Sequence, residues 1–134
     1  MNPGSPLYSS TLVAAGGATG ALLRYHAGRW ISAVAGTNTV FPWATFAINV
    51  AGSVAMGVLA GWLARHGGAG SEAWRLLLAV GVLGGFTTFS SFSLETATLI
   101  QRGHPGLAAA YAAGSVLAGT GGLFLGLMMM RTPA

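Results

Sequence analysis

The sequence has very little charge and lacks two residue types altogether, because none of its 134 residues is a cysteine or a lysine. Without cysteine the chain can form neither a disulfide bond nor a thiolate metal site. Charged residues make up 6% of the chain, whereas an average soluble domain carries about 25%. So little charge cannot cover a water-facing surface, and 53% of the residues are hydrophobic. The composition therefore predicts an integral membrane protein.

The charged and histidine side chains that are present also exclude two classes of function. The arginines are scattered along an apolar chain of net charge +4, whereas nucleic-acid binding requires a clustered basic face. We therefore expect no nucleic-acid partner. The three histidines fall in or beside predicted linkers, and the sequence contains no Ser–His–acid set, HExxH motif or phosphate-binding loop. We therefore do not expect an enzyme.

Four charge-free stretches divide the chain, at residues 7–23, 40–63, 76–94 and 106–130. An α-helix crosses the hydrocarbon core with about 20 apolar residues, so each stretch is long enough or nearly so. No basic segment precedes the first stretch, so we expect it to remain as a span rather than a cleaved signal peptide. The linkers are too short to hold a separate domain. The prediction is one all-α transmembrane domain over residues 1–134, with spans at about 7–30, 40–64, 74–100 and 106–130.

The arginines show no bias that would set the orientation of these spans. With four crossings, three arginines fall on each side of the membrane, whereas an excess of positive charge normally marks the cytoplasmic side. So few charges make the count noisy, and one arginine inside the membrane would change it. The alternative hypothesis is dual topology, in which copies insert in both directions and pair antiparallel.

The segment GGFTTFSSFS, residues 84–93, alternates phenylalanines with hydroxyl residues inside the third span. A break at Gly84 and Gly85 would free backbone carbonyls that can bind a cation, as the broken helices of transporters do. The other interpretation, which the residues leave open, is an unbroken helix with glycines at a packing contact. The positive edges of aromatic rings and hydroxyl donors can together replace part of the hydration shell of an anion.

Other spans carry polar groups at similar depth. Asn49 lies in the uncharged second span, and Thr45 and Ser53 share its helix face one turn away. Such an asparagine is either a hydrogen-bonding link between helices or part of a polar path. Further candidates are Tyr111 and Ser115 in the fourth span, Arg24 at the end of the first, which either snorkels or lines a vestibule, and Glu95, which is either interfacial or proton-coupling.

Three segments, GGATGALLRY, FPWATFAINVAGS and GGFTTFSSFSLET, resemble the Fluc/CrcB family of fluoride channels. The resemblance covers nearly the whole chain. It implies an antiparallel, dual-topology homodimer in the cell (inner) membrane, with two pores that conduct fluoride passively and with high selectivity over chloride. The lipid bilayer, fluoride and a second copy of the chain would then be its partners.

The resemblance also implies roles for individual residues. The expected fluoride pore comprises Phe89, Phe92, Asn49, Thr45, Tyr111, Ser115, Ser90 and Ser91, with Arg24 in the vestibule. The backbone carbonyls of Gly84 and Thr87 from both subunits would hold a structural sodium ion on the dimer axis. One departure is visible, because the chain has Gly119 one turn beyond Ser115, where some relatives continue with a hydroxyl.

Three rival functions agree less well with the sequence. Small multidrug exporters share the dual-topology architecture, but they resemble one another in having a glutamate in the first span, and residues 7–23 contain no acid. A proton-driven fluoride antiporter would have to use Glu95. A purely structural assembly protein is disfavoured by the polar groups on three spans, since such groups are costly in lipid.

Overall fold

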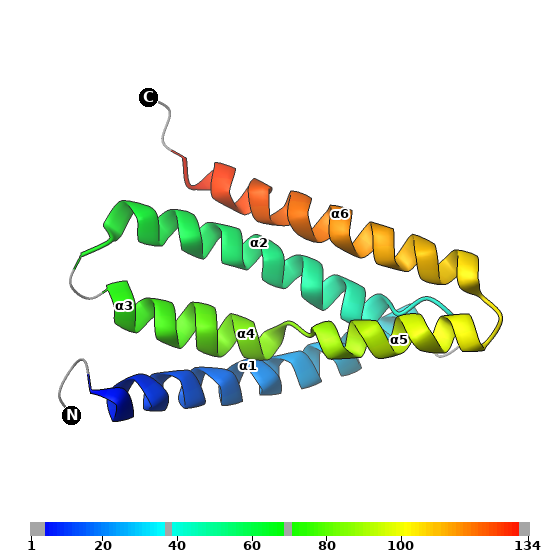
Figure 1. The fold of residues 1–134 in the computed structure, drawn as a ribbon, viewed down its shortest axis with the longest axis horizontal. Coiled ribbons are helices and arrows are strands. Elements are labelled where there is room, and N and C mark those ends of the chain that lie inside the picture. The colour runs from blue at the N-terminus through cyan, green and yellow to red at the C-terminus, as the bar shows by residue number, and fades with distance from the viewer. Residues whose placement is uncertain (1–4, 37–38, 69–70, 132–134) are drawn as a thin grey trace.

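The computed structural model describes residues 5–36, 39–68 and 71–131, which form a bundle of helices that run alternately up and down (Figure 1). The long helices are α1 (Pro6–Ala35), α2 (Trp43–His66) and α6 (Pro105–Met129). The third pass consists of α3 (Ser71–Trp74), the π-helix η1 (Arg75–Leu83), α4 (Gly84–Phe86) and, after a break, α5 (Phe89–Gln101). The described part of the chain begins and ends at the same end of the bundle. Within these described ranges, the predicted all-helical bundle with a break in its third helical segment is thus confirmed.

Helix ends are fixed by local sequence signals. Ser5 caps α1 by accepting a hydrogen bond from the backbone N–H of Tyr8 at 3.2 Å, and Pro6 follows in the first turn, where a missing N–H costs nothing. Gly103, with φ of 80°, makes the sharp turn between α5 and α6, a conformation that disfavours side chains. Pro105 then starts α6. These short connections bring consecutive passes side by side.

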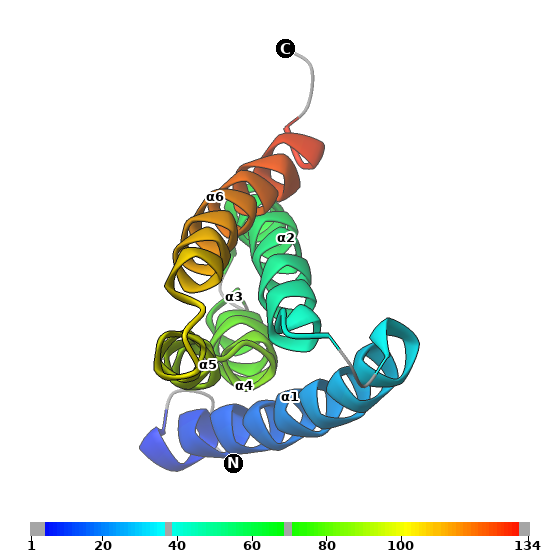
Figure 2. The same ribbon diagram turned by 90° about the vertical axis from the view of Figure 1, so that its right-hand side faces the viewer.

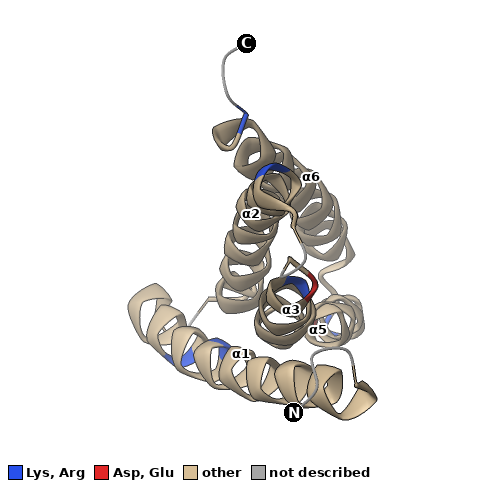
Figure 3. Cartoon of the chain, turned by 90° about the vertical axis from the view of Figure 1, so that its left-hand side faces the viewer, with Lys and Arg blue, Asp and Glu red and all other residues tan. Residues whose placement is uncertain are grey.

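Three of the four passes are long and apolar enough to cross a membrane, at Trp43–His66, Ser71–Gln101 and Pro105–Met129. The charged residues are few (Figure 3), and large apolar side chains such as Leu117 and Phe124 are exposed along the outside. Helix α1 is not among the three, because small and hydroxyl residues dilute its apolar ones. Its 30 residues nevertheless extend about 45 Å at 1.5 Å per residue. The chain is a multi-pass membrane protein, and the crossing of α1 stays a prediction.

The helices pack closely against one another through glycine. A Cβ atom at Gly16 or Gly20 of α1 would overlap the backbone of η1, and one at Gly85 would overlap the backbone at Gly17. In the same way Gly57 of α2 lies against α6. Small residues let helix backbones approach closely in lipid. Figure 2 shows the result, in which α1 lies beneath the third pass while α2 and α6 lie side by side.

The helix break lies slightly later than the sequence suggested. Gly84–Phe86 is helical, and the chain leaves the helix at Thr87 (φ −79°, ψ 159°) and Thr88 (φ −150°, ψ 113°). Both interpretations of the glycine pair therefore hold in part, because Gly85 is a packing contact with α1 and the third pass is broken two residues later. The break expected at Gly84 and Gly85 is corrected to residues 87–88. The physical reason is that extended backbone here is paired by another helix.

Candidate functional site

The break is stabilised by Asn49 of α2, whose side-chain amide pairs with Thr88 in the way that a neighbouring strand would. The Nδ2 group of Asn49 donates to the carbonyl of Thr88 at 3.1 Å, and its Oδ1 accepts from the N–H of Thr88 at 2.9 Å. Non-helical backbone at membrane depth persists only where its polar groups find partners. Asn49 is thus a link between helices, and its second N–H remains as a donor because an amide has two.

Thr88 also caps the helix that follows. Its Oγ1 accepts from the backbone N–H of Ser91 at 3.2 Å and donates to the Ser91 hydroxyl at 3.0 Å. Ser90 is exposed, and its hydroxyl lies 3.4 Å from Thr88 Oγ1. The break therefore places the N-terminus of α5, the positive end of its dipole, next to the hydroxyls of Thr88 and Ser91.

On the other side of the break, α4 presents the carbonyl end of a helix. Nη1 of Arg24 donates to the carbonyl of Thr87 at 3.1 Å, so the predicted vestibule arginine contacts the backbone of the break directly. The N–H of Thr88 bonds to Asn49 rather than to the carbonyl of Gly84, its partner in a continuous helix. The carbonyl of Gly84 is thereby released from helix bonding. Carbonyl oxygens at a helix C-terminus suit a cation.

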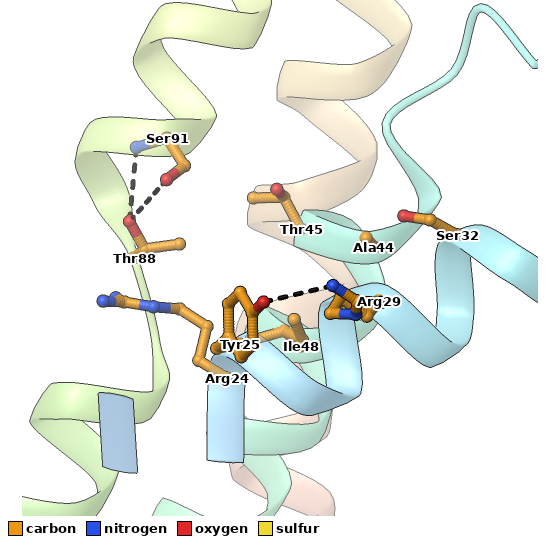
Figure 4. Close-up of a pocket in the computed structure, with 10 residues that line it drawn as sticks. Arg24, Tyr25, Arg29, Ser32, Ala44, Thr45, Ile48, Thr88 and Ser91 are labelled. Atoms are coloured by element: carbon orange, nitrogen blue, oxygen red, sulfur yellow. Dashed lines mark hydrogen bonds between the residues drawn. The ribbon is translucent and has the colours of Figure 1, made fainter. Parts of the chain in front are cut away.

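An open pocket of about 550 Å³ lies between α1, the start of α2 and the break. We call it the arginine pocket, and the residues that matter here are Arg24, Arg29, Thr45, Thr88 and Ser91 (Figure 4). Both arginines come from α1, and Nη1 of Arg29 is held 3.1 Å from the hydroxyl of Tyr25. Among the described residues, no acidic side chain lines the pocket. Its electrostatics therefore attract anions toward the break.

A second pocket, of about 320 Å³, opens beyond the break. We call it the phenylalanine pocket, and its functional lining is Asn49, Ser53, Phe89, Phe92, Ser115 and Gly119, together with Thr88. Thr88 lines both pockets, so the two hollows meet at the break. Three helices thus bring four of the eight predicted pore residues to this hollow, while Thr45 and Ser91 line the arginine pocket instead.

The two pore phenylalanines differ in exposure. Phe89 is 79% exposed in the single chain, and its ring centre lies 5.6 Å from that of Phe92. Phe92 is partly buried and packs against Tyr111 at 5.2 Å. The phenylalanine pocket also holds a polar anomaly, since the hydroxyl of Ser115 is buried without a hydrogen-bond partner among the residues that the structure describes. Buried hydroxyls are nearly always paired, so this one is available to a ligand.

Glu95 forms a cluster that the sequence did not reveal. Thr45 Oγ1 donates to Glu95 Oε1 at 2.7 Å, and the hydroxyl of Tyr111 donates to Oε2 at 2.8 Å. Tyr111 is fully buried. We call these three residues the carboxylate cluster. The sequence indicated Glu95 as an interfacial or proton-coupling acid and placed Thr45 and Tyr111 in the polar path, but their meeting depends on how three helices pack.

Comparisons with known proteins agree with the family resemblance. The family model described as CrcB-like protein, Camphor Resistance (CrcB), matches residues 11–127. A protein of Novosphingobium aromaticivorans named fluoride-specific ion channel FluC is 69% identical over 123 residues, which cover 92% of this chain and 96% of the relative. Proteins of the same name from Erythrobacter litoralis (51% identity over 94% of each chain) and Caulobacter vibrioides (53%, over 90% of this chain and 93% of the relative) are also similar.

Proposed function

Because the chain belongs to the CrcB-like family, we propose that it is a passive and highly selective fluoride channel of the cell membrane. Such a channel exports fluoride and lowers its cytoplasmic concentration. The proposal is supported by relatives that carry the name fluoride-specific ion channel and align over nearly their whole length. It makes the chain a transport protein rather than an enzyme. The observation that carries it is the pair of pockets that meet at Thr88.

The lining of these pockets suits a small, strongly hydrated anion. The arginine pocket concentrates anions, and the phenylalanine pocket then offers the free hydroxyl of Ser115, the second N–H of Asn49 and the ring edges of Phe89 and Phe92. These neutral donors replace hydration without a full positive charge. Conduction requires an ion to bind well enough to enter and weakly enough to leave, and a neutral wall meets both demands.

Two antiparallel copies, each with its own pore, complete the proposal. In a single chain Phe89 is largely exposed, so the phenylalanine pocket is open on that side and a second copy would close it. Arg24 lies at the break, so the remaining arginines number three on one side of the membrane and two on the other. So small a difference is compatible with insertion in both directions. Both observations favour the dual-topology homodimer.

A structural sodium ion fits the carbonyls at the break. The carbonyl of Gly84 has no helical partner because the N–H of Thr88 bonds to Asn49, and a carbonyl such as that of Thr87 has a second lone pair beside its bond to Arg24. Gly84 is exposed, so the partner subunit can approach it. We propose that the backbone carbonyls of Gly84 and Thr87 from both subunits would hold the ion. Its positive charge would offset the repulsion between carbonyl oxygens that are brought together on the dimer axis.

The alternative function is a proton-coupled exporter of fluoride or small molecules. Glu95 is the acid within the spans that would have to carry the proton. Both of its oxygens are occupied by hydrogen bonds from Thr45 and Tyr111, so Glu95 joins three helices as a structural contact. The channel is therefore favoured.

Fluoride efflux from proteoliposomes tests the proposal. The vesicles hold a fluoride gradient, pH is clamped, and a potassium ionophore is added or withheld. Efflux that needs the ionophore, with no matching chloride efflux, is expected of a passive and selective channel. Efflux that ignores the ionophore and follows a proton gradient would replace the channel by the exporter. No fluoride flux from well-folded dimers would refute both.

A further inference from the structure

Helices α2 and α6 run side by side in the same direction (Figure 1), and their polar residues face one another in regular pairs. Thr45 and Tyr111 meet at Glu95. One turn further along both helices, Asn49 and Ser115 line the phenylalanine pocket. A third pair at the same spacing follows in the same pocket, and it consists of Ser53 and Gly119.

The third pair has only one hydroxyl, and it faces the glycine. A Cβ atom built on Gly119 would lie 3.4 Å from Ser53 Oγ, an ordinary contact distance, so the serine hydroxyl lies directly in front of α6 where that helix has no side chain. Ser53 thus supplies a hydroxyl to the pocket from α2 at the position where α6 contributes Gly119.

The hydroxyl of Ser53 can be released at little cost. It donates to the carbonyl of Asn49, four residues earlier, at 2.8 Å. Inside an α-helix that carbonyl already accepts the backbone N–H of residue 53. The side-chain bond is therefore a second bond to a satisfied acceptor, and such back-bonding contributes little to the helix. Rotation of χ1 turns the O–H toward an anion in the pocket without leaving a buried carbonyl unpaired.

We propose that Ser53 donates a hydrogen bond to the conducted anion one turn past Asn49, in place of a hydroxyl that α6 lacks at Gly119. This inference rests on the proposed function, since the anion is fluoride. It adds a residue of α2 to the path and explains how the path stays polar although α6 carries glycine at this level.

Moving the hydroxyl from one helix to the other tests the proposal. Initial rates of fluoride efflux are measured from proteoliposomes holding the wild type, Ser53→Ala, the double variant S53A/G119S and its matched control S53A/G119A. Loss of one hydrogen-bond donor is expected to slow efflux about tenfold in S53A. S53A/G119S returns a hydroxyl to the same space, which the alanine has vacated, and should restore efflux to within about threefold of the wild type. S53A/G119A should remain slow.

The outcomes separate this inference from the function on which it rests. Wild-type protein without fluoride flux would refute the proposed channel itself. A conducting wild type with an equally fast S53A would refute only the role of Ser53. Equal recovery in S53A/G119S and S53A/G119A would show that filling space, and not supplying a donor, is what matters, and would also overturn the inference. Size-exclusion chromatography of each variant ensures that rates are compared for the same assembly.

Discussion

The carboxylate cluster and the phenylalanine pocket lie on the same helices and have opposite hydrogen-bonding states. In the cluster, both oxygens of Glu95 are bonded and Tyr111 is fully buried. In the pocket, the hydroxyl of Ser115 is buried without a partner among the described residues, and Phe89 is largely exposed. A network whose polar groups are all hydrogen-bonded makes the structure rigid. An unpaired polar group can instead bind a ligand.

Asn49 stands between these two regions and belongs partly to each. Two of its hydrogen-bonding groups hold the break at Thr88, while its side chain also lines the phenylalanine pocket. The chain therefore builds its path from groups that are paired with protein on one side and open on the other. Substitutions that remove a paired group should lower stability, and substitutions that remove an open group should lower flux.

The largest effect is expected from Asn49→Ala, which removes both hydrogen bonds to the backbone of Thr88. Two polar groups of the break would lose their partners at membrane depth, at a cost of roughly 1–3 kcal/mol each. We expect poor assembly and a large fall in the thermal unfolding midpoint, measured in detergent. Thr98→Val serves as the control, because its hydroxyl bonds only to a carbonyl four residues earlier in its own helix. Equal stability of the two variants would mean that Asn49 does not hold the break.

Phe92→Ile should reduce fluoride efflux by about tenfold or more, because isoleucine has no positive ring edge for the anion. The proposed dimer should stay assembled, since isoleucine remains apolar and bulky. Phe89→Ile is the second variant to compare, because the Phe89 side chain has few contacts within its own chain. We expect this variant to lose fluoride efflux with even less effect on stability. Efflux and size-exclusion profiles are measured for both. Dissociation of either variant, with flux lost only as a consequence, would make these side chains packing residues.

The sequence predicted the number and type of the passes because span length and low charge are local properties of the chain. It placed the break two residues early, since the glycines that attract attention are needed for contact with α1, and the extended residues are stabilised by Asn49 from a different helix. The hydrogen bond from Arg24 to the carbonyl of Thr87 could not be predicted from the sequence either. Contacts between distant segments leave no spacing signal in one sequence.

The same limit applied to Glu95. The sequence indicated it as an isolated acid near a span end, and no spacing rule links it to Thr45 and Tyr111. The resemblance had placed both of these residues in the polar path as hydrogen-bond donors, and their roles there stay predictions. What the structure adds is their present partner, the carboxylate.

Glu95→Gln should weaken the carboxylate cluster without changing the mode of transport. A glutamine oxygen can still accept from one hydroxyl, but its NH₂ group then faces the other, so one strong hydrogen bond is lost at a cost of about 1.5–3 kcal/mol. We expect a lower unfolding midpoint and slower efflux that still requires the ionophore. An exporter would behave differently, because E95Q would uncouple fluoride movement from the proton gradient. Efflux is measured with and without a pH gradient to decide between them.

Ser115→Ala should leave stability unchanged or higher while it lowers flux. The hydroxyl has no protein partner to lose, and burying a methyl group there avoids the cost of an unpaired polar atom, about 1–3 kcal/mol. Efflux should fall about tenfold if the hydroxyl donates to the moving ion. Thr45→Val is the matched control, because it also removes one hydroxyl but breaks a bond to Glu95. It should lower the unfolding midpoint. If S115A were instead the less stable of the two, its hydroxyl would be bonded to protein in the assembled channel, and the contrast between the pocket and the cluster would not hold.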